Sequence, residues 1–163
     1  MTSLQVRLAT VDELTSFGRA LATLLRAGDL VILSGELGAG KTTLTRGIGA
    51  GLRVRGDVTS PTFVIARVHP ALGDGPDLVH VDAYRLGSFA ELDDMDLDAG
   101  VESSVTVVEW GEGLAEELAD SHLGIRLDAD PDTQERTLTL RPVGSRWAAP
   151  AAHAGLRALT QED

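Results

Sequence analysis

Residues 35–42 read Gly35-Glu36-Leu37-Gly38-Ala39-Gly40-Lys41-Thr42 and match the pattern G-x-x-x-x-G-K-[ST] of phosphate-binding loops. Glycines let the backbone turn tightly, so that successive N–H groups point inward at phosphate oxygens. Lys41 supplies a mobile positive charge for the β and γ phosphates, and the hydroxyl of Thr42 is suited to bind Mg²⁺. The alternative is a glycine-rich turn that precedes a lysine by chance, but Lys41 is the only lysine of the chain. The pattern therefore predicts that residues from Glu36 to Thr43 bind a nucleotide.

The loop lies between a predicted strand and a predicted helix, as its chemistry requires. Leu30–Leu33 is a short, continuous apolar run, which is typical of a central strand that is covered on both faces. A helix is predicted from Lys41 to about Leu52, and its positive dipole end would lie at the phosphates.

The N-terminal segment predicts a strand followed by an amphipathic helix. Leu4–Ala9 alternates apolar and polar residues, which indicates a strand. Thr10 and Glu13 fit a capping box at the start of a helix that we expect to run to about Ala27. Gly28 is placed to end this helix in the left-handed conformation. The apolar face of the helix would contain Leu14, Phe17, Leu21, Leu24 and Leu25.

The remaining pattern predicts an α/β fold. Apolar runs at Phe63–Val68, Leu78–Val81 and Val105–Val108 indicate strands, and Leu123–Leu127 and Arg136–Leu140 indicate an antiparallel pair at an edge of the sheet. We expect a P-loop NTPase-like sandwich with a mixed, largely parallel central sheet flanked by helices. Residues 1–143 would form the P-loop ATPase domain. The alanine-rich residues 144–163, interrupted by Pro150, would form a short helix or a partly disordered tail in which Trp147 packs.

Composition excludes several classes of function. The 163 residues carry a formal net charge of -11, which disfavours direct groove binding of nucleic acid through a basic surface. The absence of cysteine excludes disulfides, thiolate metal sites and a cysteine nucleophile. The first ten residues contain no apolar targeting region, and no later run approaches the roughly 20 residues that span a bilayer. A soluble, cytoplasmic protein that does not bind membranes is therefore expected.

Two acidic residues follow predicted strands directly. Asp82 comes after Leu78–Val81, and Glu109 comes after Val105–Val108. Ligands of open α/β sheets bind beyond the carboxyl ends of the strands, and phosphoryl transfer needs an acid near Mg²⁺ and a group that orients the attacking water. Lys41, Asp82 and Glu109 are therefore the candidate catalytic residues. The pattern leaves open which acid binds Mg²⁺ and which positions water.

The segment that precedes these strands contains a second candidate nucleotide contact. Thr59-Ser60-Pro61-Thr62 resembles a switch segment in which hydroxyls such as those of Ser60 and Thr62 sense the γ-phosphate, although a plain turn is the alternative.

Guanine recognition by G-proteins needs N-K-x-D, and the chain has no asparagine and no second lysine. ATP is therefore favoured over GTP. The four histidines show no metal-binding spacing and are interpreted as structural. The acidic run 91–98 is interpreted as a solvated face, with protein docking as the alternative.

Five segments together resemble the TsaE family, small bacterial ATPases of tRNA modification. They are GELGAGKTTLTRG at 35–47, SPTF at 60–63, HVDAYRL at 80–86, ELDDMDLD at 91–98 and VVEW at 107–110. The resemblance covers about residues 4 to 142, and H-x-D-x-Y-R-L with a downstream E-W is its most specific part. It implies a mixed seven-stranded sheet and a weak ATPase that supports the TsaB–TsaD pair. That pair forms N6-threonylcarbamoyladenosine next to the anticodon of tRNAs that read codons beginning with A, so the tRNA would be reached through the complex.

The resemblance also implies roles for individual residues. Thr42 and Glu109 resemble Mg²⁺ ligands, and Asp82 resembles an acid beside the phosphates. Trp110 and Arg136 resemble residues that lie near the nucleotide, and Ser60 to Thr62 match the family's switch segment. Family members often have proline after the E-W pair, whereas this chain has Gly111, which implies a looser loop beyond Glu109.

Two alternatives remain open at the level of sequence. One is a small-molecule kinase with the same phosphate loop, although the sequence contains no evident lid-like insertion. The other is a nucleotide-gated binding protein with negligible catalysis, in which ATP occupancy alone sets the affinity for partners.

Overall fold

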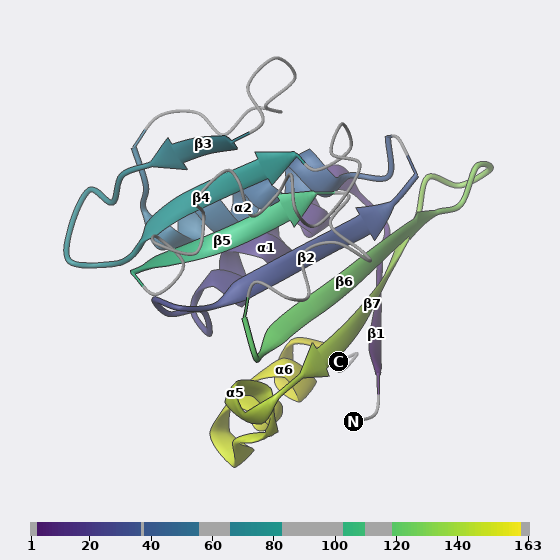
Figure 1. The fold of residues 1–163 in the computed structure, drawn as a ribbon. Coiled ribbons are helices and arrows are strands. Elements are labelled where there is room, and N and C mark those ends of the chain that lie inside the picture. The colour runs from purple at the N-terminus through teal and green to yellow at the C-terminus, as the bar shows by residue number, and fades with distance from the viewer. Residues whose placement is uncertain (1–2, 37, 56–65, 83–102, 110–118, 161–163) are drawn as a thin grey trace.

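The computed structural model describes residues 3–36, 38–55, 66–82, 103–109 and 119–160 (Figure 1). Within these ranges, seven strands form one sheet with the order β1-β7-β6-β2-β5-β4-β3. None of the helices in these ranges is long and apolar enough to cross a membrane. The elements are β1 (Leu4–Leu8), α1 (Val11–Ala22), β2 (Leu30–Gly35), α2 (Lys41–Leu52), β3 (Ala66–His69), β4 (Asp77–Asp82), β5 (Ser104–Glu109), β6 (His122–Ala129), β7 (Arg136–Val143), α5 (Ser145–Ala148) and α6 (Pro150–Thr160).

The centre of the sheet is parallel. β2 runs parallel to both of its neighbours, β5 and β6, and β4 runs parallel to β5. The outer pairs β6–β7, β7–β1 and β4–β3 are antiparallel. The predicted α/β fold with a mixed, largely parallel sheet is thereby confirmed. Because parallel strands end at the same edge, the carboxyl ends of β2, β4 and β5 meet where the glycine-rich loop begins.

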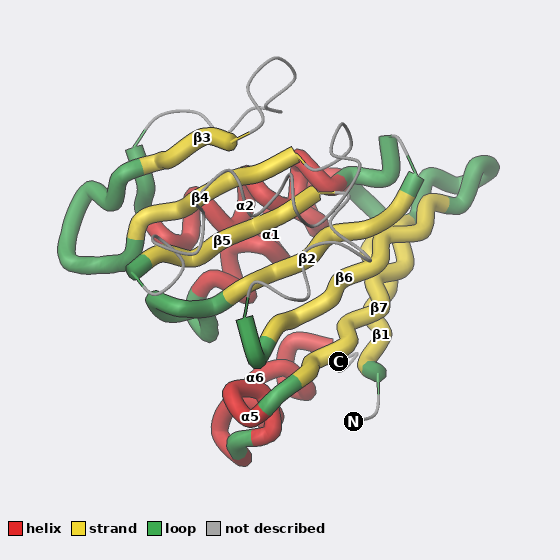
Figure 2. The backbone as a smooth tube through the Cα atoms, viewed as in Figure 1, coloured by secondary structure: helices red, strands yellow, loops and turns green. Residues whose placement is uncertain are grey.

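Helices α1 and α2 cover one face of the sheet and lie behind it in Figures 1 and 2. They approach each other at backbone distance, because a Cβ atom on Gly18 would lie 2.5 Å from the carbonyl oxygen of Leu44. A Cβ atom on Gly47 would likewise lie 2.3 Å from the carbonyl oxygen of Thr15. This close packing holds α2, and with it the glycine-rich loop, in a fixed place. The core between these helices and the sheet includes Leu14, Leu21, Leu33, Leu44, Ile48, Val105, Val107 and Ile125.

Helix α1 begins as predicted and ends earlier. The backbone N–H of Glu13 donates to the Thr10 hydroxyl at 3.1 Å, while the Glu13 carboxylate accepts from the N–H of Ala9 rather than from that of Thr10. The prediction that the helix reaches Ala27 is wrong, because α1 ends at Ala22. Tighter turns follow it, with N–H groups bonded three residues back from Leu24 to Leu21 and from Leu25 to Ala22. Gly28 has the predicted left-handed φ of 97° and turns the chain into β2.

The antiparallel pairing of β6 and β7 is confirmed over eight residue pairs, from His122 opposite Val143 to Ala129 opposite Arg136. The expectation that this pair forms an edge is wrong, because β6 lies beside β2 and β1 occupies the edge outside β7. The N-terminal strand can fill this place because Val6 and Leu8 contribute to the same core. Of the strand predicted at 63–68, residues 66–68 belong to β3, and residues 63–65 lie outside the described residues.

The C-terminal segment packs against the sheet as helices α5 and α6. Pro150 begins α6 instead of interrupting a helix, which suits a residue that lacks an N–H to bond. Trp147 is 1% exposed and, with Leu156, belongs to the same buried cluster as the sheet. Helix α6 continues to Thr160, and residues 161–163 lie outside the described residues.

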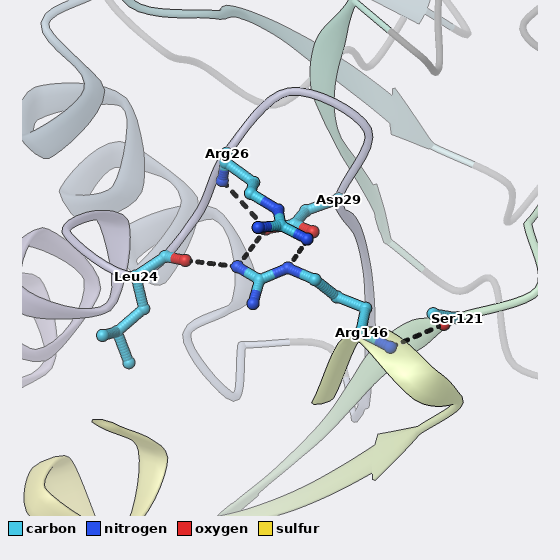
Figure 3. Close-up of polar contacts among 5 residues, drawn as sticks. All are labelled: Leu24, Arg26, Asp29, Ser121 and Arg146. Atoms are coloured by element: carbon cyan, nitrogen blue, oxygen red, sulfur yellow. Dashed lines mark hydrogen bonds and ion pairs between the residues drawn. The ribbon is translucent and has the colours of Figure 1, made fainter. Parts of the chain in front are cut away.

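A buried ion pair connects this segment to the first half of the chain (Figure 3). The guanidinium of Arg146 donates to both carboxylate oxygens of Asp29, at 2.8 and 3.0 Å, and to the carbonyl oxygen of Leu24 at 2.6 Å. The Arg146 N–H donates to the hydroxyl of Ser121 at 3.2 Å. The arginine thus joins residues that precede β2 with the turn before β6.

Candidate nucleotide-binding site

The glycine-rich loop connects the end of β2 to the start of α2 and depends on three left-handed glycines. Gly35, Gly38 and Gly40 have φ values of 143°, 83° and 110°, which other residues rarely adopt. A Cβ atom on Gly40 would also lie 2.6 Å from the Leu14 side chain. Gly40 is the N-cap of α2 and has no side chain to cap the first N–H groups. The N-terminus of α2 therefore presents backbone donors and its positive dipole end to the loop.

Lys41 begins α2, and its side chain reaches back to the loop. Lys41 is 5% exposed, and its ammonium donates to the carbonyl oxygens of Gly35 and Glu36, each at 2.9 Å. Burial lowers the pKa of Lys41, and the carboxylates of Glu109 and Asp82 oppose this shift by favouring the charged form. The ammonium is therefore held at the loop, within the electrostatic influence of Asp82 and Glu109.

Thr42 and Glu109 are brought together by the strand order. Glu109 ends β5 and is opposite both Leu33 of β2 and Asp82 of β4, so it lies beside the strand that leads into the loop. The Thr42 hydroxyl donates to the Glu109 carboxylate, with oxygen distances of 3.3 and 3.4 Å. Hydroxyl and carboxylate oxygens are hard ligands that suit Mg²⁺, which commonly takes one or two protein ligands besides nucleotide phosphates. In the described part of the chain, no cluster of three or more His, Asp or Glu residues offers an all-protein metal site.

His80 also belongs to this site, although the sequence led us to interpret it as structural. Its Nε2 contacts the Glu109 carboxylate, and the residue is completely buried. The alternation of β4 carries a signal for this, because His80 and Asp82 must lie on the same face of the strand. The histidine is therefore directed at the acid of the neighbouring strand.

Arg136 borders the loop from the opposite side. It begins β7, and its Nε donates to the carbonyl oxygen of Ala39 at 3.4 Å, while its Nη1 donates to that of Gln134 at 2.6 Å. Thr43 lies half-buried in the first turn of α2. The structure thus gathers Glu36, Gly38, Ala39, Gly40, Lys41, Thr42, Asp82, Glu109 and Arg136 at one edge of the sheet. Leu37, Ser60, Thr62 and Trp110 lie outside the described residues.

The fold and this loop define a P-loop NTPase-like α/β protein. A family model described as "Threonylcarbamoyl adenosine biosynthesis protein TsaE" matches residues 8–138. The chain belongs to the TsaE family.

Individual relatives agree with this assignment. A tRNA threonylcarbamoyladenosine biosynthesis protein TsaE from Streptomyces coelicolor is 65% identical over 135 residues, which cover 80% of this chain and 91% of that protein. The protein of the same name from Bacillus subtilis is 35% identical over 149 residues, which cover 90% of each chain. A crystal structure of Bacillus subtilis YdiB resembles the fold with a TM-score of 0.72 and 30% identity, covering 97% of this chain and 94% of that one.

Proposed function

We propose that this protein binds ATP with Mg²⁺ at the glycine-rich loop and hydrolyses it slowly in support of tRNA threonylcarbamoyladenosine formation. The observation that carries the proposal is the meeting of Lys41, Thr42 and Glu109 at the carboxyl edge of the sheet. Membership of the TsaE family supports a role in tRNA threonylcarbamoyladenosine biosynthesis. It also favours an ATPase over the alternative of a small-molecule kinase.

The residues of the loop would act mainly by binding and positioning the phosphates. The N–H groups at the start of α2 and the Lys41 ammonium would receive their negative charge. For this, the ammonium exchanges its hydrogen bonds to the carbonyls of Gly35 and Glu36 for phosphate oxygens. Arg136 and Trp110 would contact the nucleotide further from the reacting bond, and Ser60 and Thr62 would respond to the γ-phosphate.

Thr42 and Glu109 would hold Mg²⁺, which neutralises charge that develops on the phosphates. Asp82, opposite Glu109 on the neighbouring strand, would act beside the phosphates, where it is suited to orient water. The chain's own contribution is to fix these oxygens on rigid strand and helix ends. Loss of Glu109 should therefore affect turnover more than it affects nucleotide binding without Mg²⁺.

The proposal includes TsaB and TsaD as partners, and it places the protein in the cytoplasm, where tRNA is modified. The net charge of -11 supports access to tRNA through these partner proteins rather than by direct contact. ATP is proposed over GTP because the chain lacks the asparagine and second lysine of the guanine-recognition pattern.

Calorimetric titration with ATP and Mg²⁺ tests the binding step. Wild type should bind ATP, and Lys41→Ala should bind about 10- to 150-fold more weakly, because a charged hydrogen bond contributes about 1.5–3 kcal/mol. Arg141→Ala is the matched control, since it removes an exposed cation from β7 on a residue outside the candidate site. Absence of ATP binding by wild type, or equal affinity of wild type and Lys41→Ala, would overturn the proposal.

A further inference from the structure

We propose that His80 is a positioning residue for Mg²⁺ binding, and that it acts by holding the Glu109 carboxylate beside Thr42. The inference rests on the proposed function, since it concerns the same ATP and Mg²⁺ site. In this role His80 does not bind the metal itself. Its imidazole contacts the carboxylate of Glu109, which would bind the metal.

The strand register explains how the histidine reaches Glu109. In the parallel pair of β4 and β5, His80 is opposite Val107, and Asp82 is opposite Glu109. His80 and Glu109 are therefore diagonal neighbours on the face of the sheet that α2 covers, within reach of a long side chain. Glu109 in turn accepts from the Thr42 hydroxyl in the first turn of α2. One chain of contacts thus joins β4, β5 and the helix that follows the loop.

Burial makes this contact important for the orientation of Glu109. His80 is 0% exposed and Glu109 is 5% exposed, so water cannot replace a lost donor easily. A carboxylate only accepts hydrogen bonds, so the contact requires that the His80 Nε2 carry the hydrogen. Within the described part of the chain, the other ring nitrogen, Nδ1, has no hydrogen-bond partner. The polar interaction of the imidazole is therefore directed at Glu109 alone among these residues.

The position of Lys41 gives a reason why Glu109 needs such support. Lys41 directly precedes Thr42, whose hydroxyl contacts Glu109, so the ammonium and the carboxylate lie at the same end of α2 and attract each other. A carboxylate that turned toward the ammonium would be drawn away from Thr42. The hydrogen bond from His80 opposes this turn and keeps the oxygens of Glu109 at Thr42. Partners that orient metal ligands in this way commonly affect metal affinity 10- to 100-fold.

The test compares His80→Gln, which keeps a donor at a similar reach, with His80→Asn, which is too short, and His80→Leu, which has none. Calorimetry would measure ATP affinity in excess EDTA and then across a Mg²⁺ series. We expect the Mg²⁺ concentration for half-maximal tightening to rise about 10- to 100-fold in His80→Asn and His80→Leu and to return toward wild type in His80→Gln. ATP affinity in EDTA should stay within about twofold of wild type, because the loop itself is intact.

His69→Leu is the matched control, since His69 is another buried histidine and lies on the edge strand β3. It should leave the Mg²⁺ dependence unchanged. An unchanged Mg²⁺ dependence in His80→Asn, or an equal change in His80→Gln and His80→Asn, would overturn the positioning role. If wild type bound ATP without any effect of Mg²⁺, the metal part of the proposed function would fail, and the inference would fail with it.

Discussion

Replacement of Arg146 by methionine should strongly destabilise the protein, because it breaks the buried ion pair with Asp29. Asp29 is 4% exposed, and the Arg146 guanidinium donates to both of its carboxylate oxygens, at 2.8 and 3.0 Å. In Arg146→Met, the carboxylate would keep the N–H of Arg26 at 2.8 Å, and the Leu24 carbonyl would lose the arginine donor. The guanidinium also lies 4.3 Å from the centre of the Trp147 ring, and that cation–π contact would be lost.

The expected loss in free energy of unfolding is about 3–5 kcal/mol, which is typical when one partner of a buried pair is removed. This is a large share of the roughly 5–15 kcal/mol that stabilises an ordinary domain. Methionine retains much of the aliphatic volume against Trp147, so the loss would reflect mainly the unpaired carboxylate. Urea unfolding followed by circular dichroism would measure it through the midpoint at constant slope.

Two controls isolate the ion pair. Arg157→Met removes an exposed arginine from α6 and should change the free energy of unfolding by less than about 0.5 kcal/mol. Asp29→Asn combined with Arg146→Met removes the buried charge, and the double variant should be more stable than the sum of the single effects predicts, by at least about 1 kcal/mol. A loss below about 1 kcal/mol in Arg146→Met, or strict additivity in the double variant, would refute the reasoning.

Two further predictions concern packing and pH. Gly18→Ala should lower the free energy of unfolding by about 1–3 kcal/mol, because its Cβ would lie 2.5 Å from the Leu44 carbonyl oxygen. The control Gly73→Ala should not be destabilising, because its Cβ would have no atom within 4 Å. Equal urea midpoints for the two variants would contradict this. Burial lowers the pKa of His69, so the folded state binds fewer protons there than the unfolded state does. The contribution of His69 to stability is complete above about pH 6.5 and falls as the pH is lowered further. His69→Leu should therefore flatten the pH dependence of the urea midpoint below that pH. The same pH dependence in wild type and His69→Leu would contradict this prediction.

The glycine-rich loop and its surroundings were predictable because their signals are local. A continuous apolar run indicated β2, the glycines indicated the turn, and acids directly after strands indicated the carboxyl edge. The parallel direction of β4 and β5 then places Asp82 opposite Glu109. Such inferences need only the direction of neighbouring strands.

The features that were missed depend on contacts between distant residues. The placement of β1 outside β7 is determined by packing of Val6 and Leu8 on the core, which the alternation of one strand does not reveal. The contact of His80 with Glu109 depends on strand register, and that of Arg146 with Asp29 joins residues 117 positions apart. The alanine-rich composition of the C-terminal segment also concealed Trp147 and Leu156, whose burial gives α5 and α6 their place.

We propose that this chain turns over ATP at the glycine-rich loop to serve the TsaB–TsaD pair. This turnover is tested most directly by the rate of ATP hydrolysis by the purified protein, alone and with TsaB, TsaD and tRNA. Wild type should be slow alone and faster with the pair, whereas Lys41→Ala and Glu109→Ala should show no such increase. A wild-type rate that TsaB and TsaD leave unchanged, or stimulation of Lys41→Ala to the wild-type rate, would contradict the account.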